Sequence, residues 1–187
     1  MTAIQDDVLI QGDLIQLRRK RLGDAPTDYG WRTDPELAGF DAAGPLRTSY
    51  EDYLSLYREE LQYPGPYRHM FAIETRGGRH IGNVMYYNID ERRSECELGI
   101  TIGEREYWNQ GYGRDAVEAF VRLIFITTNL RRVYLNTLEW NERAQRAFEA
   151  GGFNPCGRRR RDGNIFVTME ALRDGAPPPR RSRLFPS

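Results

Sequence analysis

The sequence is short of the residues that build metal centres and disulfide frameworks. Its 187 residues include only two cysteines and two histidines. Cys96 and Cys156 lie far apart, with no CxxC or Cys/His spacing around them. This indicates neither a disulfide framework nor a zinc site, and we expect no metal ligands. The two cysteines are predicted to be buried free thiols.

Net charge and long apolar runs are lacking as well. Lysine plus arginine equals aspartate plus glutamate at 27 each, and the pI is near 6.8, so no specific nucleic-acid partner is expected. No segment approaches the ~20 apolar residues that span a bilayer. The N-terminus has no basic start followed by an apolar run. We therefore expect a cytoplasmic protein with no membrane partner.

Apolar periodicity and turn residues predict alternating strands and helices. Ser49, with Asp52 three residues later, resembles a capping box before an amphipathic helix. Gly77-Gly78 suits the turn of a two-residue hairpin. The elements expected are a strand at 14–18, a helix capped by Asp24 and running toward Trp31, a helix at 50–61, a hairpin over 69–88, a strand at 95–103, a helix after Gly113, a strand at 131–140, a helix at 141–152 begun by Asn141, and a hairpin over 157–172.

This order of elements indicates one α/β (α+β) domain over residues 1–174. We expect a mixed, mostly antiparallel sheet with helices on both faces. Residues 175–187 are rich in proline and arginine and offer no means of burying a core, so they predict a disordered tail.

The stretch YWNQGYGRDAVEAF, residues 107–120, places two glycines at the start of a helix. Glycine is the costliest residue to order there, so a specific contact should require it. The first turn of a helix has unpaired N–H groups and the positive end of the dipole, and a glycine-rich approach lets an anion lie against the main chain. The predicted ligand is a phosphate or a diphosphate.

Taken alone, GYGRDA also satisfies the dinucleotide pattern GxGxxG/A, with Glu139 as the acid that would contact a ribose. The context disfavours this interpretation, because EREYWNQ separates the glycines from Gly103 whereas the pattern needs its first glycine directly after the strand. A NAD-type protein is therefore the weaker alternative. No GxxxxGK[ST] motif occurs, which excludes a Walker loop.

A longer interval, ELGITIGEREYWNQGYGRDAV followed by RRVYLNTLEWNERAQRAFEAGGF, resembles the GNAT superfamily of acetyl-CoA-dependent N-acetyltransferases, closest to its RimJ/RimL-like branch. The resemblance covers roughly residues 10–172. The family's phosphate loop, R/Q-x-x-G-x-G/A, falls on residues 108–113, with Trp108 in the place of Arg or Gln. Its second segment, N-x-x-[AS]-x-x-x-Y-x-x-x-G-F, falls on residues 141–153. Two motifs in the right order and at the right separation make a specific signal.

The resemblance implies the GNAT fold, in which a central strand splays away from its neighbour and acetyl-CoA binds in the gap. Main-chain amides from Gln110 to Arg114 would bind the pyrophosphate. The pantetheine arm would lie along the strand from Leu98 to Ile102. The cofactor-binding residues expected on this basis are Leu98, Ile100, Ile102, Gln110, Gly111, Tyr112, Gly113, Arg114, Asn141 and Phe148.

Acetyl transfer requires a base, because the amine arrives protonated near pH 7. Glu97, beside the thioester on the splayed strand, is the first catalytic candidate, and Glu139, at the end of the next strand, is the second. Backbone N–H groups around Ile100 would stabilise the oxyanion.

The family's usual proton donor to the departing thiolate is missing. The Tyr position of the family is Phe148 and its Ser position is Ala144, so neither hydroxyl is present. Tyr134, Thr137 or an ordered water are the open alternatives. The missing hydroxyl also leaves a second hypothesis, a non-catalytic acyl-CoA-binding sensor.

In this family the acceptor site is covered by the early helices and the last hairpin. Here those helices carry acids and aromatics that suit a cationic amine such as a polyamine, a peptide N-terminus or another small amine. These residues are Asp41, Glu51, Asp52, Tyr53 and Tyr57. The predicted activity is direct acetyl transfer in a ternary complex, and a homodimer is a further expectation.

Overall fold

The computed structural model describes residues 8–173, and both the predicted tail and the first seven residues lie outside this range. Thirteen strands and helices alternate along the chain, with short 3-10 turns at Leu22–Asp24 and Arg105–Tyr107. The elements are β1 (Val8–Gln11), β2 (Ile15–Arg19), α1 (Ala25–Thr33), α2 (Pro35–Phe40), α3 (Tyr50–Gln62), β3 (Arg68–Thr75), β4 (His80–Asp90), β5 (Glu95–Ile102), α4 (Tyr112–Thr127), β6 (Arg132–Leu138), α5 (Glu142–Ala150), β7 (Asn154–Arg161) and β8 (Asn164–Leu172).

The strands form one eight-stranded sheet in the order β1-β2-β3-β4-β5-β6-β8-β7. All neighbours are antiparallel except β5 and β6, which are parallel. This parallel pair is short: it joins Glu95 to Arg132, Cys96 to Val133 and Glu97 to Tyr134, and no further. Both strands continue past these residues without pairing with each other, so they diverge. The predicted mixed sheet and its central splay are confirmed.

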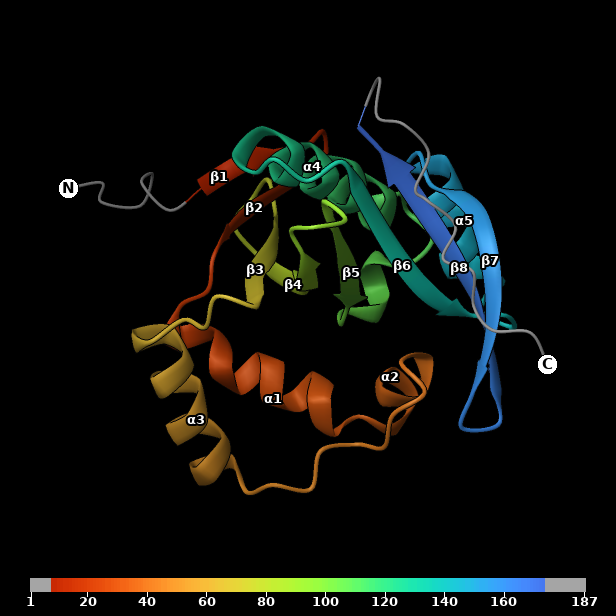
Figure 1. The fold of residues 1–187 in the computed structure, drawn as a ribbon. Coiled ribbons are helices and arrows are strands. Elements are labelled where there is room, and N and C mark those ends of the chain that lie inside the picture. Colours follow the sequence, from red (N-terminus) through yellow and green to blue (C-terminus); the bar gives the residue numbers. More distant parts are fainter. Residues whose placement is uncertain (1–7, 174–187) are drawn as a thin grey trace.

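Helices cover both faces of the sheet, as predicted. In Figure 1, α4 lies on one side and α1, α2 and α3 lie together on the other. The α4 side holds the apolar core, since α4 packs on β1, β2, β4 and β5. Phe120 of α4 is fully buried and contacts the rings of Phe71 and Tyr86. The apolar residues Ala116, Val117, Phe120 and Ile124 recur at the 3.6-residue period of a helix and form the buried stripe of α4.

On the opposite face of the sheet, a buried network of charges lies beside the buried apolar residues of α1, α2 and α3. The Arg18 guanidinium donates to both carboxylate oxygens of Asp24 at 2.8 Å and also pairs with Glu74. Burial alone would raise the pKa of Asp24, but the hydrogen bonds from Arg18, together with the charge of Lys20 and the main-chain N–H of Arg21, lower that pKa to about 2. A second pair, Lys20 with Asp28 at 2.7 Å, lies beside the first. These pairs fix α1 against the sheet.

Asp115 ties the start of α4 to the turn between β1 and β2. Its carboxylate, in the first turn of the helix, accepts hydrogen bonds from the main-chain N–H groups of Asp13, Leu14 and Ile15 at 2.8–3.0 Å. Gly12 is required beside it, because a Cβ there would lie 2.4 Å from an Asp115 oxygen. The contact holds the glycine-bearing end of α4 in place.

Most local predictions hold, but two elements were missed and three predictions are wrong. The two-residue turn at Gly77-Gly78 is wrong, because residues 76–78 join Thr75 to Arg79 and only Gly78 has a positive φ, of +85°. Ser49 caps α3 by accepting from Asp52 N, and Gly152 ends the α5 region with φ +91°. Strand β1 and the six-residue helix α2 were not predicted. Asp24 is wrong as a side-chain cap of α1, because its carboxylate is held by Arg18 and the chain enters α1 through the 3-10 turn. Cys96 is buried as expected, but Cys156 is exposed, because β7 is an edge strand with solvent along its length.

Candidate active site

Glu97 stands at the apex of the splay, as the last β5 residue that pairs with β6. Only 7% of its surface is exposed. Its two carboxylate oxygens accept hydrogen bonds from Asn136 Nδ2 at 2.7 Å and Asn88 Nδ2 at 2.9 Å. Opposite Glu97, burial and this carboxylate raise the pKa of Tyr134 to about 12. An ionisable carboxylate and a protonated phenol therefore face each other where the strands separate.

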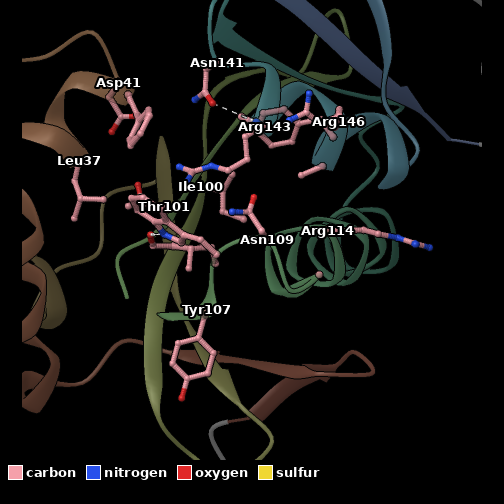
Figure 2. Close-up of a pocket in the computed structure, with 18 residues that line it drawn as sticks. Leu37, Asp41, Ile100, Thr101, Tyr107, Asn109, Arg114, Asn141, Arg143 and Arg146 are labelled. Atoms are coloured by element: carbon pink, nitrogen blue, oxygen red, sulfur yellow. Dashed lines mark hydrogen bonds between the residues drawn. The ribbon is translucent and has the colours of Figure 1, made fainter. Parts of the chain in front are cut away.

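A cavity of about 370 Å³ opens along β5, with walls from four parts of the chain. These are α2, the end of β5, the segment from Tyr107 to Arg114, and α5 (Figure 2). The lining residues are Leu37, Phe40, Asp41, Ile100, Thr101, Ile102, Tyr107, Trp108, Asn109, Gly111, Gly113, Arg114, Asn141, Arg143, Ala144, Arg146, Ala147 and Phe148.

The two glycines of the loop serve different purposes. Gly111 is the N-cap of α4 and has φ +89°, a conformation that other residues adopt only with strain. Gly113 has no such need: a Cβ there would meet only Ile102 Cγ1, at an ordinary 3.8 Å. No side chain caps the first N–H groups of α4. The backbone conformation therefore requires glycine at position 111, whereas glycine at position 113 leaves the main chain open to the cavity.

Trp108 fills the loop position that is Arg or Gln in the family pattern. Its indole Nε1 donates to Ile102 O at 2.7 Å, which fixes the ring against the end of β5. The guanidinium of Arg143, from α5, lies 3.9 Å above the ring centre of Trp108 and 4.9 Å from that of Phe40. Both distances lie within cation–π range. Residues from α2, the loop and α5 thus meet in one stack.

Three arginines line the cavity, and two of them have acidic partners. Arg114 donates to Glu118 at 2.7 Å, and Arg146 donates to Glu142 at 3.2 Å. Within residues 8–173, Arg143 has no carboxylate at ion-pair distance, and burial lowers its pKa. In Figure 2 the Arg114 side chain points away from the cavity, whereas Arg143 reaches across it toward Ile100 and Thr101.

Asp41 supplies the cavity with a negative charge. It follows α2, lines the cavity at its rim, and is exposed to solvent. No side chain in the described range donates a hydrogen bond to its carboxylate. The surrounding protein raises the pKa of this carboxyl group, while the charge of Arg32 acts in the opposite direction.

Helix α5 brings its predicted motif residues to the cavity. Asn141 caps the helix, as predicted, by accepting from Ala144 N at 3.2 Å. Ala144 and Phe148 also line the cavity, so the positions that carry a hydroxyl in the family are apolar here. Tyr134 and Thr137 do not line it.

Seven predicted cofactor residues lie together on the cavity wall, and three do not reach it. The lining residues are Ile100, Ile102, Gly111, Gly113, Arg114, Asn141 and Phe148. Leu98 is buried in the core, and neither Gln110 nor Tyr112 has a side chain on the wall. Glu139 also lies off the cavity and pairs with Arg158 at 3.3 Å. Sequence reasoning missed Phe40 and Arg143, although Asp34-Pro35 is a helix-start signal for the short helix that carries Phe40.

Comparison with known proteins identifies the family. Residues 15–154 match the family model described as an acetyltransferase (GNAT) domain. N-acetyltransferase p20 of Bacillus licheniformis, itself uncharacterized, is 24% identical over 121 residues, which are 64% of this chain and 67% of that protein.

Two solved structures illustrate the shared fold. The spermidine N-acetyltransferase of Vibrio cholerae in complex with CoA and spermine has a TM-score of 0.75 at 20% identity, covering 85% of this chain and 95% of that one. An aminoglycoside acetyltransferase in complex with coenzyme A has a TM-score of 0.70 at 19% identity, with coverages of 85% and 95%.

The chain belongs to the GNAT acetyltransferase family, whose model covers most of it. It is an acetyl-CoA-dependent N-acetyltransferase, with acetyl-CoA as its cosubstrate. In residues 8–173 no helix is long and apolar enough to cross a membrane.

Proposed function

We propose that this enzyme transfers acetyl from acetyl-CoA to a cationic primary amine by direct attack in a ternary complex. The observation that carries the proposal is the cavity at the splay, which has the open N-terminus of α4 on one side and the carboxylate of Asp41 on another. The first suits an anionic cosubstrate and the second a cationic acceptor. We place the enzyme in the RimJ/RimL-like branch on its two sequence motifs.

The residues at the glycine loop fit the cosubstrate. The space where a Cβ of residue 113 would lie is open, since the atom found near it, Ile102 Cγ1, is 3.8 Å away. The amides at the start of α4 can therefore be approached by a diphosphate. Ile100 and Ile102 of β5 line the same cavity and are no longer paired with β6. The main-chain groups of Ile100 suit the amide groups of a pantetheine arm, whereas Ile102 O is already bound by Trp108 Nε1.

The chemistry is assigned to the apex of the splay. The amine nitrogen attacks the thioester carbonyl, a C–N bond forms and the C–S bond breaks. We assign Glu97 as the base that takes the ammonium proton, through a water because Glu97 lies behind the cavity wall. The Ile100 N–H is the proposed oxyanion donor. Tyr134, whose raised pKa keeps it protonated, is the proposed proton source for the thiolate, also through a water because it does not line the cavity.

The acceptor is proposed to be a small amine with more than one positive charge. Within residues 8–173 the carboxylate of Asp41 accepts no side-chain hydrogen bond, and Phe40 and Trp140, 5.7 Å apart, offer aromatic faces beside it. Two structural relatives act on polyamines and aminoglycosides, which are both polycationic amines. Peptide N-termini remain the alternative acceptor. A cytoplasmic location and a homodimer stay part of the proposal.

The test is release of free CoA thiol from acetyl-CoA in the presence of single amines. Spermidine, an aminoglycoside and a short peptide with a free N-terminus form the panel, and the same peptide with an acetylated N-terminus is the control. We expect turnover with at least one polycationic amine. Saturable acetyl-CoA binding without turnover of any amine would instead favour the sensor hypothesis, which the apolar Phe148 and Ala144 keep as the second candidate.

A further inference from the structure

Arg143 is the one cavity-lining arginine without an acidic partner in the described part of the chain. Arg114 and Arg146 are paired with carboxylates of their own helices. Arg143 instead rests on aromatic rings, 3.9 Å from the centre of Trp108 and 4.9 Å from that of Phe40. A partly buried cation without a counter-ion carries a desolvation cost, so an anionic ligand would bind there favourably.

The place where Arg143 rests is next to the glycine loop. Trp108, which supports the guanidinium, is hydrogen-bonded through Nε1 to Ile102 O at 2.7 Å. Ile102 is in turn the residue whose side chain a Cβ at Gly113 would meet, at 3.8 Å. Arg143 and the open end of α4 therefore line the same cavity, and Trp108 and Ile102 connect the two.

We propose that Arg143 is a cosubstrate-anchoring residue that pairs with the diphosphate of acetyl-CoA. This inference rests on the assignment of acetyl-CoA as cosubstrate. The amides of α4 bind the diphosphate from one wall, and the guanidinium binds it from the wall formed by α5. Trp108 holds the guanidinium ready for this contact, which limits the side-chain entropy lost on binding.

Phosphate contacts of arginine are charge-assisted, so the expected effect is large. Arg143→Ala should weaken acetyl-CoA binding by about 10- to 100-fold, the range for loss of a hydrogen bond to a charged group. Arg143→Lys keeps the positive charge but lacks the planar guanidinium, so its affinity for acetyl-CoA should lie between those of the wild type and Arg143→Ala. The affinity of the wild type should also decrease more steeply with salt than that of Arg143→Ala.

The experiment is calorimetric titration of both proteins with three ligands. Acetyl-CoA and its 3′-dephospho form both carry the diphosphate, so Arg143→Ala should lose the same factor with each. Acetyl-pantetheine lacks all phosphates, so the two proteins should bind it equally. Arg58→Ala is the matched control, since Arg58 is a helical, exposed arginine of α3 without an ion pair in residues 8–173.

Three results would overturn the assignment. Equal acetyl-CoA affinity of the wild type and Arg143→Ala would show that Arg143 does not bind the diphosphate. An equal loss with acetyl-pantetheine would show that Arg143 acts by packing, and a loss confined to the 3′-phosphorylated ligand would place it on the ribose phosphate. None of these three results would contradict acetyl transfer as the activity. Failure of the wild type to acetylate any amine would refute the proposed acceptor chemistry but not the role of Arg143.

Discussion

Gly113→Ala separates a requirement of folding from a requirement of binding. The added methyl group would meet only Ile102 Cγ1 at 3.8 Å, so it fits the protein without strain. Gly113 lies in the first turn of α4, where alanine is favoured over glycine by up to about 1 kcal/mol. The variant should therefore be as stable as the wild type or melt higher, by no more than about 2–4 °C.

The same methyl group should weaken acetyl-CoA binding. It would project where the diphosphate is proposed to approach the amides, and loss of one hydrogen bond to a charged group costs about 1.5–3 kcal/mol. That is about a 10- to 100-fold increase in Kd. Calorimetric titration with acetyl-CoA measures this, and thermal melting measures stability.

Gly111→Ala is the matched control for that experiment. Its φ of +89° makes any side chain strained, so this variant should lose stability by about 1–2 kcal/mol. A Gly113→Ala protein with unchanged acetyl-CoA affinity would refute the diphosphate site at this loop. A Gly113→Ala protein that melts well below the wild type would show instead that the glycine serves the fold.

Three further predictions concern catalysis, the acceptor and acid stability. Glu97→Gln should lower kcat by about 100-fold or more with acetyl-CoA affinity retained, and near-normal kcat would remove Glu97 as the base. Asp41→Asn should raise KM for a cationic amine by about tenfold with kcat unchanged, and an equal KM would dismiss Asp41 as the acceptor site. Because the folded pKa of Asp24, about 2, lies below its ordinary 3.8, its contribution of about 2 kcal/mol is present above pH 4 and lost toward pH 2. Urea midpoints from pH 5 to pH 2 should show this loss in the wild type, and Arg18→Met, less stable throughout, should lack that part of the pH dependence.

Local sequence signals were sufficient for most of the elements. Asp162-Gly163 provides two consecutive positive φ angles, so the last hairpin follows from two residues. The stripe on α4 and the cap at Ser49 are equally local. The short helix α2 has only six residues, which is too few for a periodic pattern to be recognised.

Contacts between distant segments were outside the reach of the sequence. The hydrogen bonds from the main-chain N–H groups of residues 13–15 to the Asp115 carboxylate cannot be inferred from the sequence around either segment. Asp24 has the residue type of a helix cap, but a stronger partner, Arg18, takes its carboxylate. Trp108 departs from the family pattern for a reason that only the fold reveals, because it supports an arginine from α5.

The distribution of charge in the cavity argues for two ligands of opposite sign. Arg143 and Asp41 line one cavity but do not pair with each other, and neither forms an ion pair with another residue in the range 8–173. If both charges served only the fold, pairing them would remove part of the desolvation cost that the partly buried Arg143 now carries. Kept apart, each can neutralise a ligand, the anionic cosubstrate at α5 and the cationic acceptor at the end of α2. The thioester and the amine would then meet between them, above β5, where the strands leave the main chain unpaired.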